Sequence, residues 1–198
     1  MIFVNRRNRN NTKSNNLKEI NLMPPIEEKK LITSNVKAIT EEERIKEMLW
    51  GEPTWFLFHT LAEKIREEHF MKLKPELINI VKNICSNLPC PECKQHAMAK
   101  IKTLNDKAIN EKESFKKALL IFHNEVNQRL NKPQFTIEDL NNKYSKGKLV
   151  DIILYFRQQW NIKIGNPKLM NEALHRKMML DELHTWCVKY VNANYFDM

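Results

Sequence analysis

A helical period of apolar side chains runs through the chain from Glu41 onward, and it limits the possible folds more than any other feature. The period is strongest over residues 113–131 and stops before Pro133. The apolar positions of this segment recur at helical spacing: Phe115, Leu119, Phe122, Val126 and Leu130. We find no convincing strand pattern and no internal repeat. The sequence therefore predicts an all-α fold.

Glycine and proline mark the ends of the other helical segments. Gly51 and Pro53 predict the start of a helix that we expect to run to about Glu68. Pro75 is expected to open the next helix, which ends at Leu88–Pro89. Further helical segments are predicted from Cys90–Pro91, over 136–143, over 148–160 and over 167–192.

Composition excludes several classes of protein. The 198 residues suffice for one or two domains with a buried core, and only 3 are glycine. Neither GxGxxG nor GxxxxGK[ST] occurs, which excludes Rossmann-type and P-loop nucleotide binding. No apolar run reaches the ~18 residues of a transmembrane helix, and the apolar start of the chain is too short for a signal peptide.

Positive charge is concentrated near the N-terminus. The net charge is +9, and +5 of it lies in residues 1–40, which also lack a sustained helical period. We expect residues 1–44 to be a mobile, Asn- and Lys-rich basic arm. Such an arm can make weak contacts with polyanions without making the whole chain a nucleic-acid binder.

Cys90 and Cys93 form a CxxC motif at the predicted start of a helix. This spacing brings both sulfurs within disulfide reach, and the N–H groups of a helix N-terminus favour a thiolate. Three interpretations compete. A thioredoxin-like fold would need a βαβ setting, which this sequence does not offer. Zinc could be bound by both cysteines together with Cys85 and His96, although the spacing matches no familiar finger. The third interpretation is a redox-active disulfide beside a cofactor.

Two further pairs favour the cofactor interpretation. Trp55 and His59 are four residues apart and share one helix face, and the same spacing separates His123 from Asn127. Asn124 lies next to the second pair. Each of these residues alone has an ordinary structural explanation. Together they offer an aromatic wall, two imidazoles and two carboxamides, which suit a planar heteroaromatic cofactor.

These residues belong to three stretches that together resemble the Erv/ALR family of FAD-dependent sulfhydryl oxidases. Residues 51–62 read GEPTWFLFHTLA, residues 88–93 read LPCPEC, and residues 123–133 read HNEVNQRLNKP. They match the family patterns G-x3-W-x3-H-x2-A, P-C-x-x-C and H-N-x-V-N-x-x-L-x-K-P. The order and separations also agree over 45–145, and three linked motifs are far more specific than CxxC alone.

The resemblance implies a bundle of four helices plus a short fifth, a bound FAD, and a homodimer. It implies that Cys93 lies next to the flavin and that substrate thiols attack Cys90. The residues implied to contact FAD are Trp55, His59, His123, Asn124, Val126, Asn127 and Lys132, with Lys132 at the pyrophosphate. Tyr144 would replace the family's aromatic cap on adenine.

From this resemblance we expect a sulfhydryl oxidase that forms disulfides in substrate proteins. Electrons would pass from dithiols through Cys90 and Cys93 to FAD and then to O2, giving H2O2. The alternative is a non-catalytic helical binding module stabilised by zinc at Cys85, Cys90, Cys93 and His96.

The chain also departs from the family. A second CxxC, which many cellular members carry as an electron shuttle, is absent from the sequence. The short form and the basic arm look more like the oxidases of large DNA viruses, which would place the protein in the host cytoplasm or virus factory and in the virion. We therefore expect an arm over 1–44, an FAD-binding core over 45–145 and an accessory helical extension over 146–198. Cys85 and Cys187 have no role in the family pattern, and we expect both to be packed thiols. The alternative for Cys187 is a lone relay sulfur that hands substrate electrons to Cys90.

Overall fold

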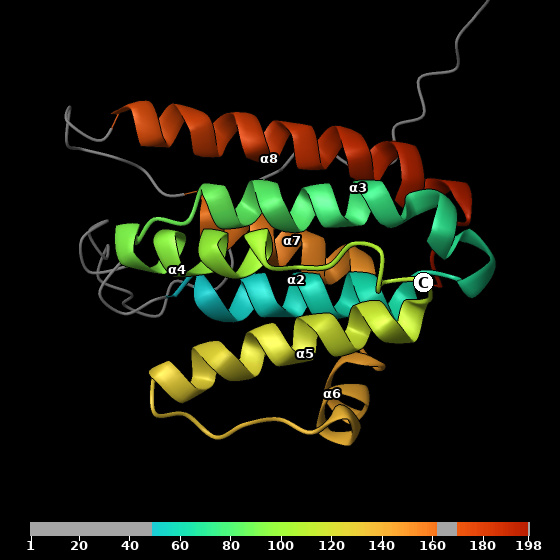
Figure 1. Ribbon diagram of the computed structural model, residues 1–198. Helices are drawn as coiled ribbons and strands as arrows, with labels where there is room; N and C mark the ends of the chain where they lie inside the picture. The colour runs from blue at the N-terminus through green and yellow to red at the C-terminus, as the bar shows by residue number, and fades with distance from the viewer. Residues whose placement is uncertain (1–48, 162–169, 198) are drawn as a thin grey trace, which may run out of the picture. The chain divides into compact units, whose positions relative to one another are not determined.

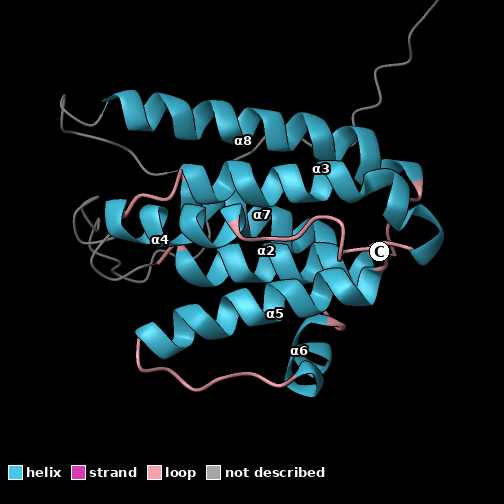
Figure 2. Ribbon diagram, in the orientation of Figure 1, coloured by secondary structure: helices cyan, strands magenta, loops and turns pink. Residues whose placement is uncertain are grey.

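The structure is a computed structural model that describes residues 49–161 and 170–197. These residues form helices joined by loops (Figures 1 and 2). Their sole β-type pairing is an isolated bridge between Ile65 and Phe196. The prediction of an all-α fold is confirmed. Residues 1–44, expected to be a basic arm, lie outside the described residues.

The expected bundle consists of α2 (Gly51–Lys64), α3 (Glu67–Ser86), α4 (Pro91–Lys102) and α5 (Lys112–Arg129), followed by the short α6 (Ile137–Tyr144). Two further helices follow in the described residues, α7 (Leu149–Trp160) and α8 (Met170–Tyr190), and then the short 3-10 helix η2 (Val191–Ala193). Helix α2 is central, because it packs against α5, α6 and α7. Helix α3 packs against α4 on one side and α8 on another (Figure 1).

The first helix is shorter than predicted. We expected it to run to about Glu68, but α2 ends at Lys64 and Ile65 adopts an extended conformation. The backbone here bonds to the end of the chain, because Arg66 N–H donates to Tyr195 O at 3.0 Å and Asp197 N–H donates to Lys64 O at 2.7 Å. These long-range hydrogen bonds replace those that a continuing helix would make, so the break costs little.

The prediction that Pro75 opens a helix is wrong, because Pro75 lies inside α3. Proline there removes one helical hydrogen bond. Its side chain is exposed, whereas Phe70, Leu73 and Leu77 on the other face are buried. Burial of this apolar face on both sides of the proline outweighs the lost bond.

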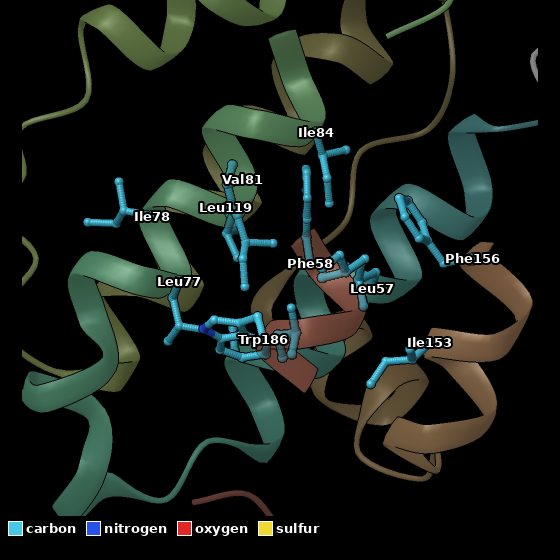
Figure 3. Close-up of a cluster of buried hydrophobic side chains, with 14 of the residues drawn as sticks. Leu57, Phe58, Leu77, Ile78, Val81, Ile84, Leu119, Ile153, Phe156 and Trp186 are labelled. Atoms are coloured by element: carbon cyan, nitrogen blue, oxygen red, sulfur yellow. The ribbon is translucent and has the colours of Figure 1, made fainter. Parts of the chain in front are cut away.

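Among the described residues, a hydrophobic cluster joins α2, α3, α4, α5, α7 and α8 (Figure 3). The side chains labelled in that view come from α2, α3, α5, α7 and α8. Within α7, Leu149, Phe156 and Trp160 are at most 1% exposed. Helix α7, part of the segment over 146–198 that we expected to be an accessory extension, therefore shares the core of the bundle.

Gly147 allows the chain to turn from α6 into α7. A Cβ atom at this position would lie 2.6 Å from Ile152 Cδ1, closer than real side chains approach. Because glycine has no Cβ, the first turn of α7 can pack against the end of α6. This turn brings α7 back onto α2.

Among the described residues, no helix is both long enough and apolar enough to cross a membrane.

Candidate functional site

Cys90 and Cys93 lie at the N-terminal end of α4 and are joined in a disulfide with a Cα–Cα distance of 5.2 Å. Cys90 is the N-cap residue, and its Sγ accepts the backbone N–H of Cys93 at 3.2 Å. Pro91 occupies the first turn, where a missing N–H costs nothing. The cap therefore places both sulfurs at a partly exposed helix N-terminus, a setting that stabilises a thiolate once the disulfide opens.

The four residues of the zinc alternative do not form a metal site. Cys85 is 2% exposed within the apolar face of α3, and the sulfurs of Cys90 and Cys93 are bonded to each other. His96 is exposed, with its Nε2 3.7 Å from Glu92 Oε1. In residues 49–161 and 170–197, no group of three or more His, Cys, Asp or Glu side chains could hold a metal ion. The zinc module is therefore not favoured.

Helices α2 and α5 together build a stack of aromatic rings. The indole of Trp55 lies parallel to the imidazole of His123, with ring centroids 4.0 Å apart and planes 8° apart. His59 stacks on Tyr144 of α6, with centroids 4.8 Å apart. The two imidazoles are joined directly, because His59 Nε2 lies 3.0 Å from His123 Nδ1. One ring must donate the proton of this hydrogen bond, so the two tautomers are linked.

Burial keeps both histidines neutral. The pKa of His59 is lowered from 6.5 to about 3 by burial first, then by His123 and Lys143. The pKa of His123 is lowered to about 4 by burial, then by Lys143 and Lys132. Burial also raises the pKa of the Tyr144 hydroxyl, helped by the negative charge of Glu52. The stack is therefore uncharged at neutral pH, and its rings are available for stacking and neutral hydrogen bonds.

The two asparagines of the H-N-x-V-N stretch hold the loop after α5. The amide of Asn124 donates to Phe135 O at 2.8 Å and accepts Phe135 N–H at 2.9 Å. Asn127 Nδ2 donates to Pro133 O at 3.1 Å. These bonds fix a loop in which Asn131 has a φ of 53° and Lys132 N–H donates to Asn127 O at 2.8 Å. The asparagines therefore position Lys132 and Phe135 at the site.

A cavity of about 620 Å³ lies between these elements. Its volume is in the usual range for small-molecule and cofactor sites. Six of the eight residues that sequence reasoning assigned to FAD line it: Trp55, His123, Val126, Asn127, Lys132 and Tyr144. Cys93 also lines the cavity, whereas Cys90 is not among the lining residues. His59 and Asn124 are not among the lining residues, but they form hydrogen bonds with His123 and Phe135, which do line the cavity.

The chemistry of this cavity fits FAD. Trp55 and His123 offer flat apolar faces to a fused ring system, and the Asn127 carboxamide offers polar atoms to ring nitrogens and oxygens. Lys132 and Lys143 supply positive charge for a pyrophosphate. A sulfur of the disulfide is part of the same wall. Aromatic faces, cations and a cysteine of the disulfide thus meet in one cavity.

Sequence reasoning missed several lining residues. Tyr155 and Gln159 of α7 line the cavity although they lie beyond the recognised motifs. Their spacing of four residues places them on one helix face. The sequence shows this spacing but does not show what that face contacts. Phe135 and Arg129 also line it. No local signal points to Phe135, because its position depends on the Asn124 clamp.

The remaining cysteines are packed thiols. Cys85 is 2% exposed and Cys187 is 5% exposed, and both are free. Burial raises the pKa of each thiol from 9.0 to about 12. Neither is therefore ionised appreciably at neutral pH, and a thiol in that state is a poor nucleophile.

A helical bundle with a CxxC disulfide, one sulfur of which lines a cofactor-sized cavity, is an arrangement suited to dithiol–disulfide exchange. The Erv1/Alr family model matches residues 52–145, which span α2 through α6. This chain belongs to the Erv1/Alr family.

Its relatives include viral and plant proteins. A FAD-linked sulfhydryl oxidase of African swine fever virus is 33% identical over 103 residues, which cover 52% of this chain and 86% of the relative. A protein of invertebrate iridescent virus 3 is 30% identical over 97 residues, covering 48% of this chain and 66% of the relative. A FAD-linked sulfhydryl oxidase of Oryza sativa subsp. japonica is 28% identical over 113 residues, covering 57% of this chain and 55% of the relative. No solved structure matches the chain.

Proposed function

We propose that this chain is a FAD-linked sulfhydryl oxidase that forms disulfides in substrate proteins, with dioxygen as the electron acceptor. One observation carries the proposal. The Cys90–Cys93 disulfide places Cys93 on the wall of the cavity that holds the Trp55 and His123 rings. The African swine fever virus relative, 33% identical over this region, bears the name of that activity.

The two cysteines have different tasks. A substrate thiolate attacks Cys90 Sγ, the disulfide opens, and the electron pair of the broken bond remains on Cys93 Sγ. The second thiolate of the substrate then displaces Cys90 from the mixed disulfide, which leaves both active-site sulfurs reduced. FAD held in this cavity would supply the two-electron acceptor for this dithiol, with O2 as the final acceptor and H2O2 as the product.

The cavity residues hold and orient the cofactor. We assign ring stacking to Trp55 and His123, polar contact to Asn127, and pyrophosphate contact to Lys132, with Val126 and Tyr144 closing the wall. His59 orients the imidazole of His123 through their hydrogen bond. Asn124 positions the loop that carries Lys132. Neutral imidazoles at this site require no counterion, which suits an apolar ring system.

The test is a visible spectrum of the purified protein together with oxygen uptake in the presence of a dithiol. We expect a yellow protein that consumes oxygen. Cys93→Ser and Cys90→Ser should each keep FAD and lose nearly all turnover, because neither sulfur has a substitute. Cys187→Ser is the matched control and should keep most of the turnover, since that thiol is buried. A colourless protein with stoichiometric zinc would contradict the proposal, as would equal turnover in all three variants.

Three further expectations belong to the same proposal. The resemblance to the family supports a homodimer, which the mass in solution tests. The excess of positive charge in residues 1–40 supports weak polyanion contact that is lost at high salt. The viral relatives support a location in the host cytoplasm or virus factory and in the virion.

A further inference from the structure

The last turn of α5 brings a positive charge to the disulfide. Arg129 Nη2 lies 3.9 Å from Cys93 Sγ, and Arg129 lines the same cavity. An ion pair between Lys100 of α4 and Glu125 of α5 links the two helices one turn earlier. This pair fixes the end of α5 against α4, so that the guanidinium reaches the sulfur.

The two sulfurs of the disulfide have different electrostatic surroundings. Cys90 Sγ accepts the backbone N–H of Cys93, which is a neutral donor. Cys93 Sγ faces a full positive charge on Arg129. A cationic side chain beside a sulfur favours its thiolate form and makes it a better leaving group.

Other charged groups around Cys93 set the size of this effect. Glu92 Oε1 lies 3.9 Å from Arg129 Nη1 and 3.7 Å from His96 Nε2, so one carboxylate faces two basic groups. Lys132 lines the same cavity. The Arg129 side chain is 30% exposed, whereas that of Glu92 is 75% exposed. Water therefore screens the carboxylate more strongly than the guanidinium, and a net positive field remains at the sulfur.

We propose that Arg129 is a catalytic residue that stabilises the Cys93 thiolate released when a substrate thiolate attacks Cys90. In this step the Cys90–Cys93 bond breaks, a disulfide forms between the substrate and Cys90, and the electron pair stays on Cys93 Sγ beside the guanidinium. The charge thereby directs substrate to Cys90, because attack there expels the better leaving group. The direction of exchange rests on the proposed function.

The test titrates Cys93 in the full-length chain as purified. Cys90→Ser leaves Cys93 free, and the buried Cys85 and Cys187 have pKa values of about 12 and do not interfere. The rate of alkylation of Cys93 by iodoacetamide is measured by peptide mass spectrometry between about pH 5 and pH 10. The midpoint of the rate curve reports the pKa of this thiol.

Adding Arg129→Gln removes a partly screened positive charge beside Cys93. The midpoint should therefore rise by about one pH unit, and at pH values below the midpoint the alkylation rate should fall about tenfold. Arg129→Lys keeps the positive charge, so its midpoint should stay close to that of the Cys90→Ser parent. Gln128→Ala, at the exposed neighbouring position, should leave the curve unchanged. Arg129→Met, which keeps the aliphatic stem, should reproduce the shift and replaces glutamine if that variant folds poorly.

Curves that coincide for the Arg129→Gln or Arg129→Met chain and its Cys90→Ser parent would overturn the role of Arg129. Equal shifts with Arg129→Lys and Arg129→Gln would overturn the charge-based explanation. The titration needs no turnover. A wild-type chain that binds no FAD would contradict the proposed function, while this experiment would still decide the role of Arg129.

Discussion

His59 and His123 illustrate how burial changes the chemistry of single residues. Histidine in water is half protonated near pH 6.5, yet both rings here lie in an apolar stack and bond to each other. A proton on either ring would place a charge in this stack, and a proton on the accepting nitrogen would also break the hydrogen bond. Burial therefore dominates the lowering of both pKa values, to about 3 and about 4.

This pair predicts a pH-dependent stability. The unfolded chain binds protons at both histidines below about pH 6.5, whereas the folded chain excludes them down to about pH 4. The free energy of unfolding should therefore be constant with respect to these groups above pH 7. It should fall by about 2.5 kcal/mol between pH 7 and pH 5.5. Urea unfolding at the two pH values measures the difference.

A variant separates this effect from other titrations. His123→Gln should remove about half of the pH dependence, because one of the two suppressed protonations is gone. His175→Gln, at an exposed position of α8, is the matched control and should preserve it. An undiminished pH dependence in His123→Gln would show that the buried pair is not its source.

Helix α7 shows how an element outside the family match completes the site. It lies beyond residues 52–145, yet Tyr155 and Gln159 line the cavity. Trp160 Nε1 donates to Thr54 Oγ1 at 3.1 Å, and Thr54 Oγ1 donates to Trp50 O at 2.6 Å. These bonds tie the end of α7 to the first turn of α2, one residue before Trp55. These buried hydrogen bonds therefore fix the position of the part of the cavity wall that α7 contributes.

From this arrangement we predict that α7 contributes to FAD binding. The Gln159 carboxamide offers both a donor and an acceptor to the cofactor. Gln159→Ala should weaken FAD binding about two- to tenfold, the usual effect of losing one hydrogen bond. Gln158→Ala, at the exposed neighbouring position, should not change it. The dissociation constant from flavin fluorescence measures both, and equal constants would show that Gln159 makes no contact.

At the scale of the whole molecule, α7 lies after the family match but belongs to the same core. Leu149, Phe156 and Trp160 are each at most 1% exposed, and α7 packs along α2. Burying each such side chain is worth about 1.5–3 kcal/mol, against a total stability of about 5–15 kcal/mol for a typical domain. Loss of α7 would expose the apolar side chains of α2 that pack against it, and α2 carries Trp55 and His59.

We therefore predict that a chain ending at Ser145 does not fold to a stable state. Its thermal unfolding, followed by circular dichroism, should lack a cooperative transition. Deletion of residues 1–40 is the control, and it should keep both flavin and thiol oxidation because it removes no motif residue. A truncated chain that unfolds cooperatively and retains flavin would show that residues 146–198 are an accessory extension.

Local patterns in the sequence predicted much of this molecule. Helical periodicity located α5 and α7 within a few residues, because an amphipathic helix repeats its apolar face every three to four positions. The CxxC spacing placed both sulfurs within disulfide reach at a helix start, and the structure joins them in a disulfide there. Trp55 and His123 were selected from four-residue spacings and motif order, and both line the cavity. These features depend on neighbours in sequence.

Tertiary structure decided what local patterns cannot encode. The break at Ile65 depends on backbone pairing with Phe196, 131 residues away in the chain, and Pro75 remains helical because its opposite face is buried. Helix α7 lies against the cavity because Trp160 at its end forms a hydrogen bond with Thr54 of α2. The approach of Arg129 to Cys93 likewise needs two helix ends to meet. Sequence spacing determines which residues share a face, whereas burial and long-range hydrogen bonds decide which faces meet.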